Sequence, residues 1–130
     1  MLSYKLVVIF VVALACPNAL FAQDAARPSL KLPTTMFAAA AAADWATTYH
    51  GLKHYRLRET NPLLRPLERT PAKMVVLGAA IDMGGVAPWN HAVGRKHPRV
   101  AVAGLWAMTA FRAYLAVHNI RNQERAGRRR

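Results

Sequence analysis

Each of three apolar stretches of this chain carries one ionisable residue near its middle: Asp44, Asp82 and Arg112. A charged side chain at the centre of a membrane span costs roughly 2.5–3.5 kcal/mol even on lenient insertion scales, so such residues usually face other helices and pair. An arginine can fork onto a carboxylate, which is the strongest way to compensate a buried charge. We therefore expect the three residues to meet, either as a clamp that fixes helix register or as a relay for protons or ions.

The predicted cluster holds two carboxylates and only one guanidinium. Either one aspartate is protonated, or hydroxyl groups on the same helices complete the solvation of the charges. Suitable hydroxyls belong to Thr47, Thr48 and Thr109. The buried polar cluster predicted from the sequence thus comprises Asp44, Thr48, Asp82 and Arg112.

A second group of polar residues is expected near one end of the helices. His50 and His54 are one turn apart, and His118 lies at the same level near the end of the third stretch. Together with Glu59 they form an alternative prediction, a zinc or iron site. Asn61 and Pro62 in the loop motif have a plainer explanation, as the cap and first residue of a short helix. The sequence requires no cofactor.

The elements that must position these residues are three helices, predicted over residues 34–55, 72–93 and 100–120. Each has 21 or 22 residues, or about 32 Å of helix, which matches a hydrocarbon core of about 30 Å. We predict an all-α fold of three transmembrane helices in an antiparallel hairpin array. Small residues at interface spacing are expected to line the helix contacts: Ala39, Ala43, Ala80, Gly84, Ala103 and Ala107. The alternative is a soluble periplasmic three-helix bundle.

The N-terminal segment has the features of a secretory signal peptide. Lys5 precedes ten apolar residues, Leu6 to Ala15, and a small residue, Ala22, ends the segment. The predicted organisation is a signal peptide over 1–22, a periplasmic linker over 23–33, the membrane domain over 34–120 and a basic cytoplasmic tail over 121–130. An uncleaved anchor and a lipoprotein cut before Cys16, the single cysteine, are the alternatives.

The chain has 18 Lys and Arg residues against six Asp and Glu residues, a formal net charge of +12. The cations cluster between the apolar stretches, which favours anionic lipids over nucleic acid as the partner. Eleven of them flank the first loop and the C-terminus, and five flank the opposite end. This asymmetry predicts a multi-pass protein of the bacterial inner membrane, with a periplasmic mature N-terminus and a cytoplasmic C-terminus.

Two short motifs carry a family resemblance. The run Asp44-Trp45-Ala46-Thr47-Thr48 and the run Glu59-Thr60-Asn61-Pro62-Leu63-Leu64 resemble a family of small bacterial multi-pass membrane proteins with a D-x-x-[ST]-T and E-x-N-P-L-[LM] pattern. The family has no assigned activity. Members often have glycines before the Glu, where this chain has residues 54–58. The resemblance implies a constellation of Asp44, Thr48, Glu59, Asn61, Pro62, His118 and Asn119.

These observations predict a small integral membrane protein with a structural or partner-binding role. Its expected partners are membrane lipids and either a second copy of the chain or another membrane protein. The alternatives are an intramembrane proton or ion relay, a metal-dependent site, and a soluble periplasmic binding module. The sequence indicates no reaction or substrate.

Overall fold

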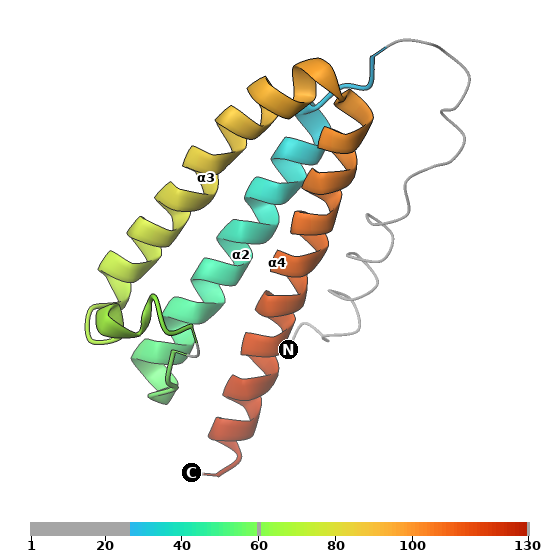
Figure 1. Ribbon diagram of the computed structural model, residues 1–130. Coiled ribbons are helices and arrows are strands. Elements are labelled where there is room, and N and C mark those ends of the chain that lie inside the picture. The colour runs from blue at the N-terminus through green and yellow to red at the C-terminus, as the bar shows by residue number, and fades with distance from the viewer. Residues whose placement is uncertain (1–26, 60, 130) are drawn as a thin grey trace.

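The computed structural model describes residues 27–59 and 61–129 of the chain, and these residues form helices, turns and no strand. Three long helices, α2 (Lys31–Tyr55), α3 (Pro71–Lys96) and α4 (Pro98–Gly127), are joined in hairpin order (Figure 1). A short 3-10 helix, η2 (Arg65–Leu67), lies in the first connection. The prediction of an all-α fold with three helices is confirmed for this part of the chain.

The helix ends differ from the predicted boundaries. Helix α2 begins at Lys31, inside the predicted linker, and α4 continues past Ile120 to Gly127, so most of the predicted basic tail is helical. The predicted signal peptide, with Cys16, lies outside the described residues. Of the described helices, α4 alone is long and apolar enough to cross a membrane by length and composition.

Local chemistry explains where the helices begin and end. Proline occupies the first turn of both α3 and α4, where its missing N–H has no helical partner to lose. Helix α2 ends at Arg56, whose left-handed backbone (φ 53°) lets its N–H donate to the Gly51 carbonyl. Only His97 separates α3 from α4, so these two helices must turn back on each other sharply.

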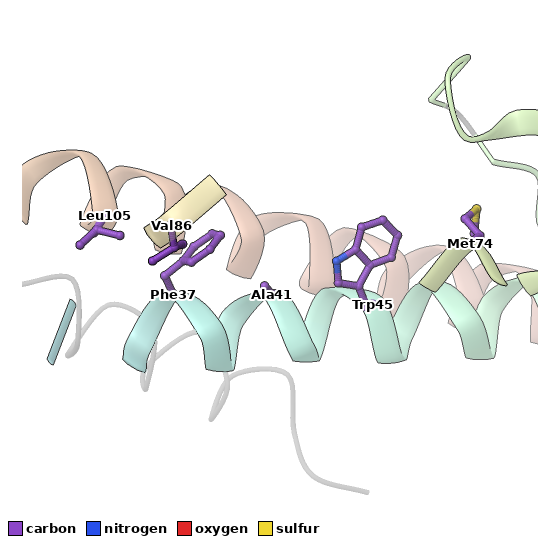
Figure 2. Packing of buried hydrophobic residues seen from close by; sticks show 6 residues of the cluster. All are labelled: Phe37, Ala41, Trp45, Met74, Val86 and Leu105. Carbon is purple, nitrogen blue, oxygen red and sulfur yellow. The ribbon is translucent and has the colours of Figure 1, made fainter. Parts of the chain in front are cut away.

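Helix α2 lies between α3 and α4 and packs most extensively against α4 (Figure 1). A single row of buried side chains follows its inner face, namely Phe37, Ala41 and Trp45 (Figure 2). Met74 and Val86 from α3 and Leu105 from α4 complete this core. The row recurs at every fourth residue, the spacing that places side chains on one face of a helix.

The predicted small-residue contacts are wrong within this chain. All six of the predicted small residues are exposed in the structure. The close approaches instead occur at Gly78, which lies against the indole ring of Trp45, and at Gly104, which lies against that of Trp89. The two indole rings fill the contacts between the helices at these glycines. The predicted alanines therefore lie on the outward faces of the helices.

Candidate functional site

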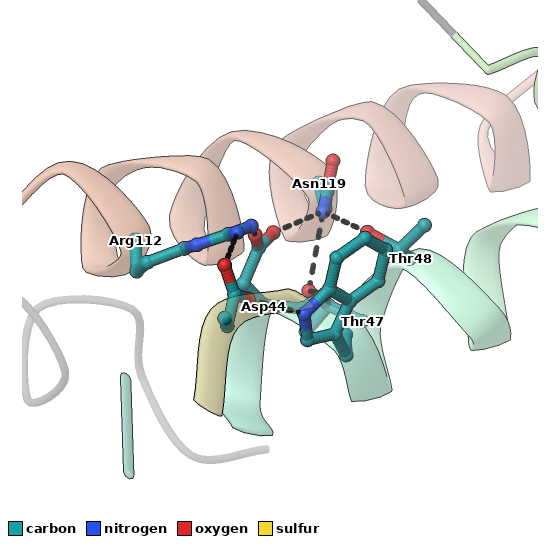
Figure 3. A network of polar contacts seen from close by, with 7 residues as sticks. Asp44, Thr47, Thr48, Arg112 and Asn119 are labelled. Atoms are coloured by element: carbon teal, nitrogen blue, oxygen red, sulfur yellow. Dashed lines mark hydrogen bonds and ion pairs between the residues drawn. The ribbon is translucent and has the colours of Figure 1, made fainter. Parts of the chain in front are cut away.

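Arg112 joins all three helices through one guanidinium group (Figure 3). Its Nη1 donates to Oδ2 of Asp44 on α2 at 2.7 Å, and its Nη2 donates to Oδ1 of Asp82 on α3. Each helix supplies one charge, and the three charges lie in contact. The two N–H groups of the planar guanidinium thus bridge two carboxylates, one on each neighbouring helix, in place of the bidentate pair with one carboxylate.

The two carboxylates have no free oxygen. The remaining oxygen of Asp82, Oδ2, accepts a hydrogen bond from the indole Nε1 of Trp45 at 2.8 Å. The remaining oxygen of Asp44, Oδ1, accepts one from the amide of Asn119 at 3.1 Å. Complete pairing matters here, because a buried charge that lacks partners is far more costly than one that has them.

Burial places these contacts inside the bundle. The side chain of Asp44 is 5% exposed, that of Asp82 9% and that of Arg112 18%. The guanidinium carbon of Arg112 also lies 5.2 Å from the centre of the Trp45 ring, within the range of a cation–π contact. Trp45 therefore stabilises both partners of the α3–α4 ion pair.

Asn119 is a central member of the cluster, although the sequence prediction placed it with His118 at the helix end. Its Nδ2 lies 3.1 Å from Asp44, 2.9 Å from the Thr48 hydroxyl and 3.3 Å from the Thr47 hydroxyl. The signal that could have revealed it is its spacing of two helical turns from Arg112, which puts both on one face of α4. Thr109, by contrast, donates to the Leu105 carbonyl on its own helix.

Substitution of Asn119 tests whether its amide is needed as a donor. We expect Asn119→Leu to lower the free energy of unfolding by about 1–3 kcal/mol, since Asp44 loses a buried partner. Asn119→Asp should cost more, because it places a second carboxylate against Asp44. Thermal unfolding of the purified protein would measure both. An Asn119→Asp variant as stable as the parent would contradict the assigned contact.

A second set of polar contacts joins the C-terminal half of α2 to the C-terminal end of α4. The ring nitrogen Nδ1 of His50 lies 2.9 Å from Oε1 of Gln123, and the Gln123 amide donates to the Thr47 carbonyl at 2.7 Å. Sequence reasoning missed Gln123. It follows Asn119 by one turn, so the periodicity of Arg112 and Asn119 could have indicated it.

The structure does not bring the predicted metal ligands together. The rings of His50 and His54 contact each other in a tilted arrangement with centres 4.7 Å apart, whereas His118 stacks on Tyr114. Within residues 27–59 and 61–129, no group of three or more His, Cys, Asp or Glu side chains is placed to hold a metal ion. The four residues of the predicted site, His50, His54, Glu59 and His118, are therefore not gathered around one point in the structure.

The loop motif builds the first connection. Oε1 of Glu59 accepts a hydrogen bond from the backbone N–H of Asn61 at 2.8 Å, and Oδ1 of Asn61 accepts one from the N–H of Leu63 at 3.0 Å. Asn61 thus caps a turn that leads into η2. This is the self-capping that makes Asn common at turns. Pro62 occupies the residue after the cap, in a turn and not in the predicted helix.

A cleft of about 750 Å³ opens between α2, α4 and the first connection. Its lining includes Asp44 and Arg112 of the charged cluster, and it continues to Arg129, two residues beyond the end of α4. Thr48, Glu59, Asn61, His118 and Asn119 also line it, whereas His50 and His54 do not. The residues singled out by the family resemblance are therefore mostly lining residues of one cavity.

No family model, curated protein or solved structure matches this chain. The role of the site consequently has to be inferred from its own geometry.

Proposed function

We propose that the chain is an integral inner-membrane protein whose three helices all cross the bilayer and whose role is structural or partner-binding. The observation that carries this proposal is the arrangement of charge. The lone charged residue within each long apolar stretch points inward to the Arg112 cluster, while the outward faces beside it are apolar.

The outward faces form an apolar belt around the bundle. Exposed positions are all alanine over residues 39–46 of α2, and all apolar or glycine over residues 76–88 of α3 and 100–111 of α4. Large side chains contribute to it, with Val76 70% exposed, Ile81 62% and Phe111 59%. A contiguous exposed apolar surface of this kind is typical of contact with lipid or with another protein.

The positions of the flanking cations support crossing by every helix. Each long helix carries two cations 22 residues apart, one on either side of its apolar stretch. They are Lys31 and Lys53 on α2, Lys73 and Arg95 on α3, and Arg99 and Arg121 on α4. That spacing is about 33 Å of helix, close to the thickness of a hydrocarbon core. The excess of cations at the end with the first connection favours a cytoplasmic location for that end.

The contacts of the charged cluster support a structural role over a relay. A relay needs a carboxylate that can release its proton to a neighbouring acceptor or to water, but every oxygen of Asp44 and Asp82 accepts a hydrogen bond from a named donor. A cluster with all its groups satisfied holds the helices in one register. The resemblance to small multi-pass membrane proteins agrees with this placement.

Cysteine labelling distinguishes the membrane protein from a soluble bundle. Because Cys16 is the single cysteine of the chain, Cys16→Ser yields a background in which one new cysteine can be probed. Ala80→Cys and Ala107→Cys lie at exposed positions of the belt, and Arg69→Cys lies in the first connection. In membranes, we expect a water-soluble maleimide to label only the Arg69→Cys variant.

The same variants provide the control. After transfer to denaturant, all three cysteines should react, which shows that every thiol is intact. Because Ala80 and Ala107 are exposed on the folded chain, packing within the chain does not account for their protection in membranes. Fast labelling of Ala80→Cys and Ala107→Cys in membranes would refute the three-span proposal. Release of the protein by carbonate washing would refute membrane integration altogether.

A further inference from the structure

The cleft beside α4 has a cationic end and an inner end, where apolar side chains lie beside the paired charges of Asp44 and Arg112. Arg58, Arg125 and Arg129 line the first, and all three side chains are exposed. Arg125 lies in the last turn of α4, and Arg129 follows two residues after the helix ends. Arg58 lines the cleft from the first connection.

These three arginines make no ion pair with another described residue, since both ion pairs in this part of the chain belong to Arg112. The lining also holds two carboxylates. Asp44 is bound to Arg112, and Glu59 accepts the Asn61 N–H but makes no ion pair with a described residue. Three arginines therefore share this end of the cleft with one unpaired carboxylate, which leaves it with a net positive charge.

The remaining walls change in character with depth. Thr48, Asn119 and Asn122 line the middle. Phe111 and Leu115 line the inner end, beside the paired charges of Asp44 and Arg112. From Arg125 to Phe111 the cleft follows fourteen residues of α4, or about 21 Å. Because Phe111 is 59% exposed and belongs to the apolar belt, the inner end of the cleft opens toward the proposed lipid phase.

We propose that this cleft binds a phosphate-bearing anionic lipid, with the phosphate at Arg58, Arg125 and Arg129 and an acyl chain along Phe111 and Leu115. Arginine suits phosphate because its planar fork can donate two parallel hydrogen bonds to phosphate oxygens. The hydroxyl and amide groups between the two ends match the ester region of a glycerolipid. A cavity of about 750 Å³ is within the usual range for small-molecule sites. The inference rests on the proposed membrane placement.

A charge-matched pair of variants tests the site. The cleft variant carries Arg58→Gln, Arg125→Gln and Arg129→Gln. The control variant carries Arg65→Gln, Arg69→Gln and Arg128→Gln, which removes the same charge from the same end of the molecule at exposed positions outside the cleft. Both are purified in neutral detergent beside the parent, and circular dichroism establishes that their helix content is equal.

Native mass spectrometry then measures binding of phosphatidylglycerol, phosphatidylcholine and inorganic phosphate. We expect one phosphatidylglycerol per chain on the parent, with an affinity that falls roughly tenfold or more in the cleft variant. The control variant should stay within about twofold of the parent, because its three arginines do not line the cleft. The parent should prefer phosphatidylglycerol to phosphatidylcholine.

Three outcomes would overturn the proposal. The first is an absence of phosphatidylglycerol binding to the parent. The second is an equal loss in both variants, which would indicate general attraction between a cationic protein end and anionic lipid. The third is inorganic phosphate binding as tightly as the lipid and competing with it, which would assign the site to a soluble phosphate. These measurements use purified protein, so they are separate from the labelling experiment that tests the membrane placement.

Discussion

Arg112→Ala is expected to prevent accumulation of the folded protein. The substitution leaves the carboxylates of Asp44 and Asp82 together in the bundle without their shared cation. Loss of one partner from a buried ion pair typically costs about 3–5 kcal/mol. That loss is a large part of the total free energy of unfolding, which is roughly 5–15 kcal/mol for an ordinary domain. Yield in membranes and thermal unfolding in detergent would measure the loss.

Arg99→Ala is the matched control, since Arg99 is an exposed arginine on the same helix. It should change stability by less than about 0.5 kcal/mol. A triple variant with Arg112→Met, Asp44→Asn and Asp82→Asn removes all three charges, and we expect it to recover most of the lost yield. If Arg112→Ala accumulates and unfolds like the parent, the cluster does not hold the helices together.

Gly78→Ala is the second substitution with a large expected effect. An added Cβ would lie 2.1 Å from Cζ2 of Trp45, far inside any real contact. The indole ring has little freedom to move away, because it is 6% exposed and its Nε1 is bound to Asp82. We expect a loss of about 1–3 kcal/mol in the free energy of unfolding, as is typical of overpacked cores.

Gly84→Ala on the same helix provides the contrast. A Cβ added at Gly84 meets nothing within 4 Å, and alanine is preferred to glycine within a helix by roughly 0.5–1 kcal/mol. Gly78→Ala should therefore lower the unfolding temperature, whereas Gly84→Ala should raise it or leave it unchanged. Equal behaviour of both glycine variants would show that α3 does not seat Trp45 at Gly78.

Both substitutions affect the contacts of the same side chain, Trp45. Trp45 packs on Gly78, donates to Asp82 and lies beside the Arg112 guanidinium. Damage to the packing on one side should consequently weaken the ion pair on the other. The two substitutions are expected to be less than additive when combined, because each disrupts the same contacts.

The spacing of residues along the sequence allowed part of this site to be predicted. Asp44, Asp82 and Arg112 were expected at one depth, since each lies near the middle of a helix of similar length, and in the structure they are in contact. The Asn61 cap was also expected, although it begins a turn and not a helix. Such features depend on the distance along a single helix or within a few residues, which the order of residues specifies.

Features that depend on the rotation of one helix against another could not be predicted in this way. The alanines expected between the helices are exposed, because Trp45 and Trp89 occupy the contacts on Gly78 and Gly104. The predicted metal ligands were separated for the same reason, since the level of a histidine along its helix does not fix the direction in which it points.

The sequence by itself determined that there are three helices in the described chain, where they reverse, and that each long apolar stretch contains one charge at mid-height. These are consequences of helical rise, proline positions and hydrophobic composition. Only the tertiary structure decided that Asn119 and Trp45 complete the charge cluster and that Arg58 shares a cleft with Arg125 and Arg129. Those pairings follow from how side chains of different volume pack, and packing is a property of all three helices together.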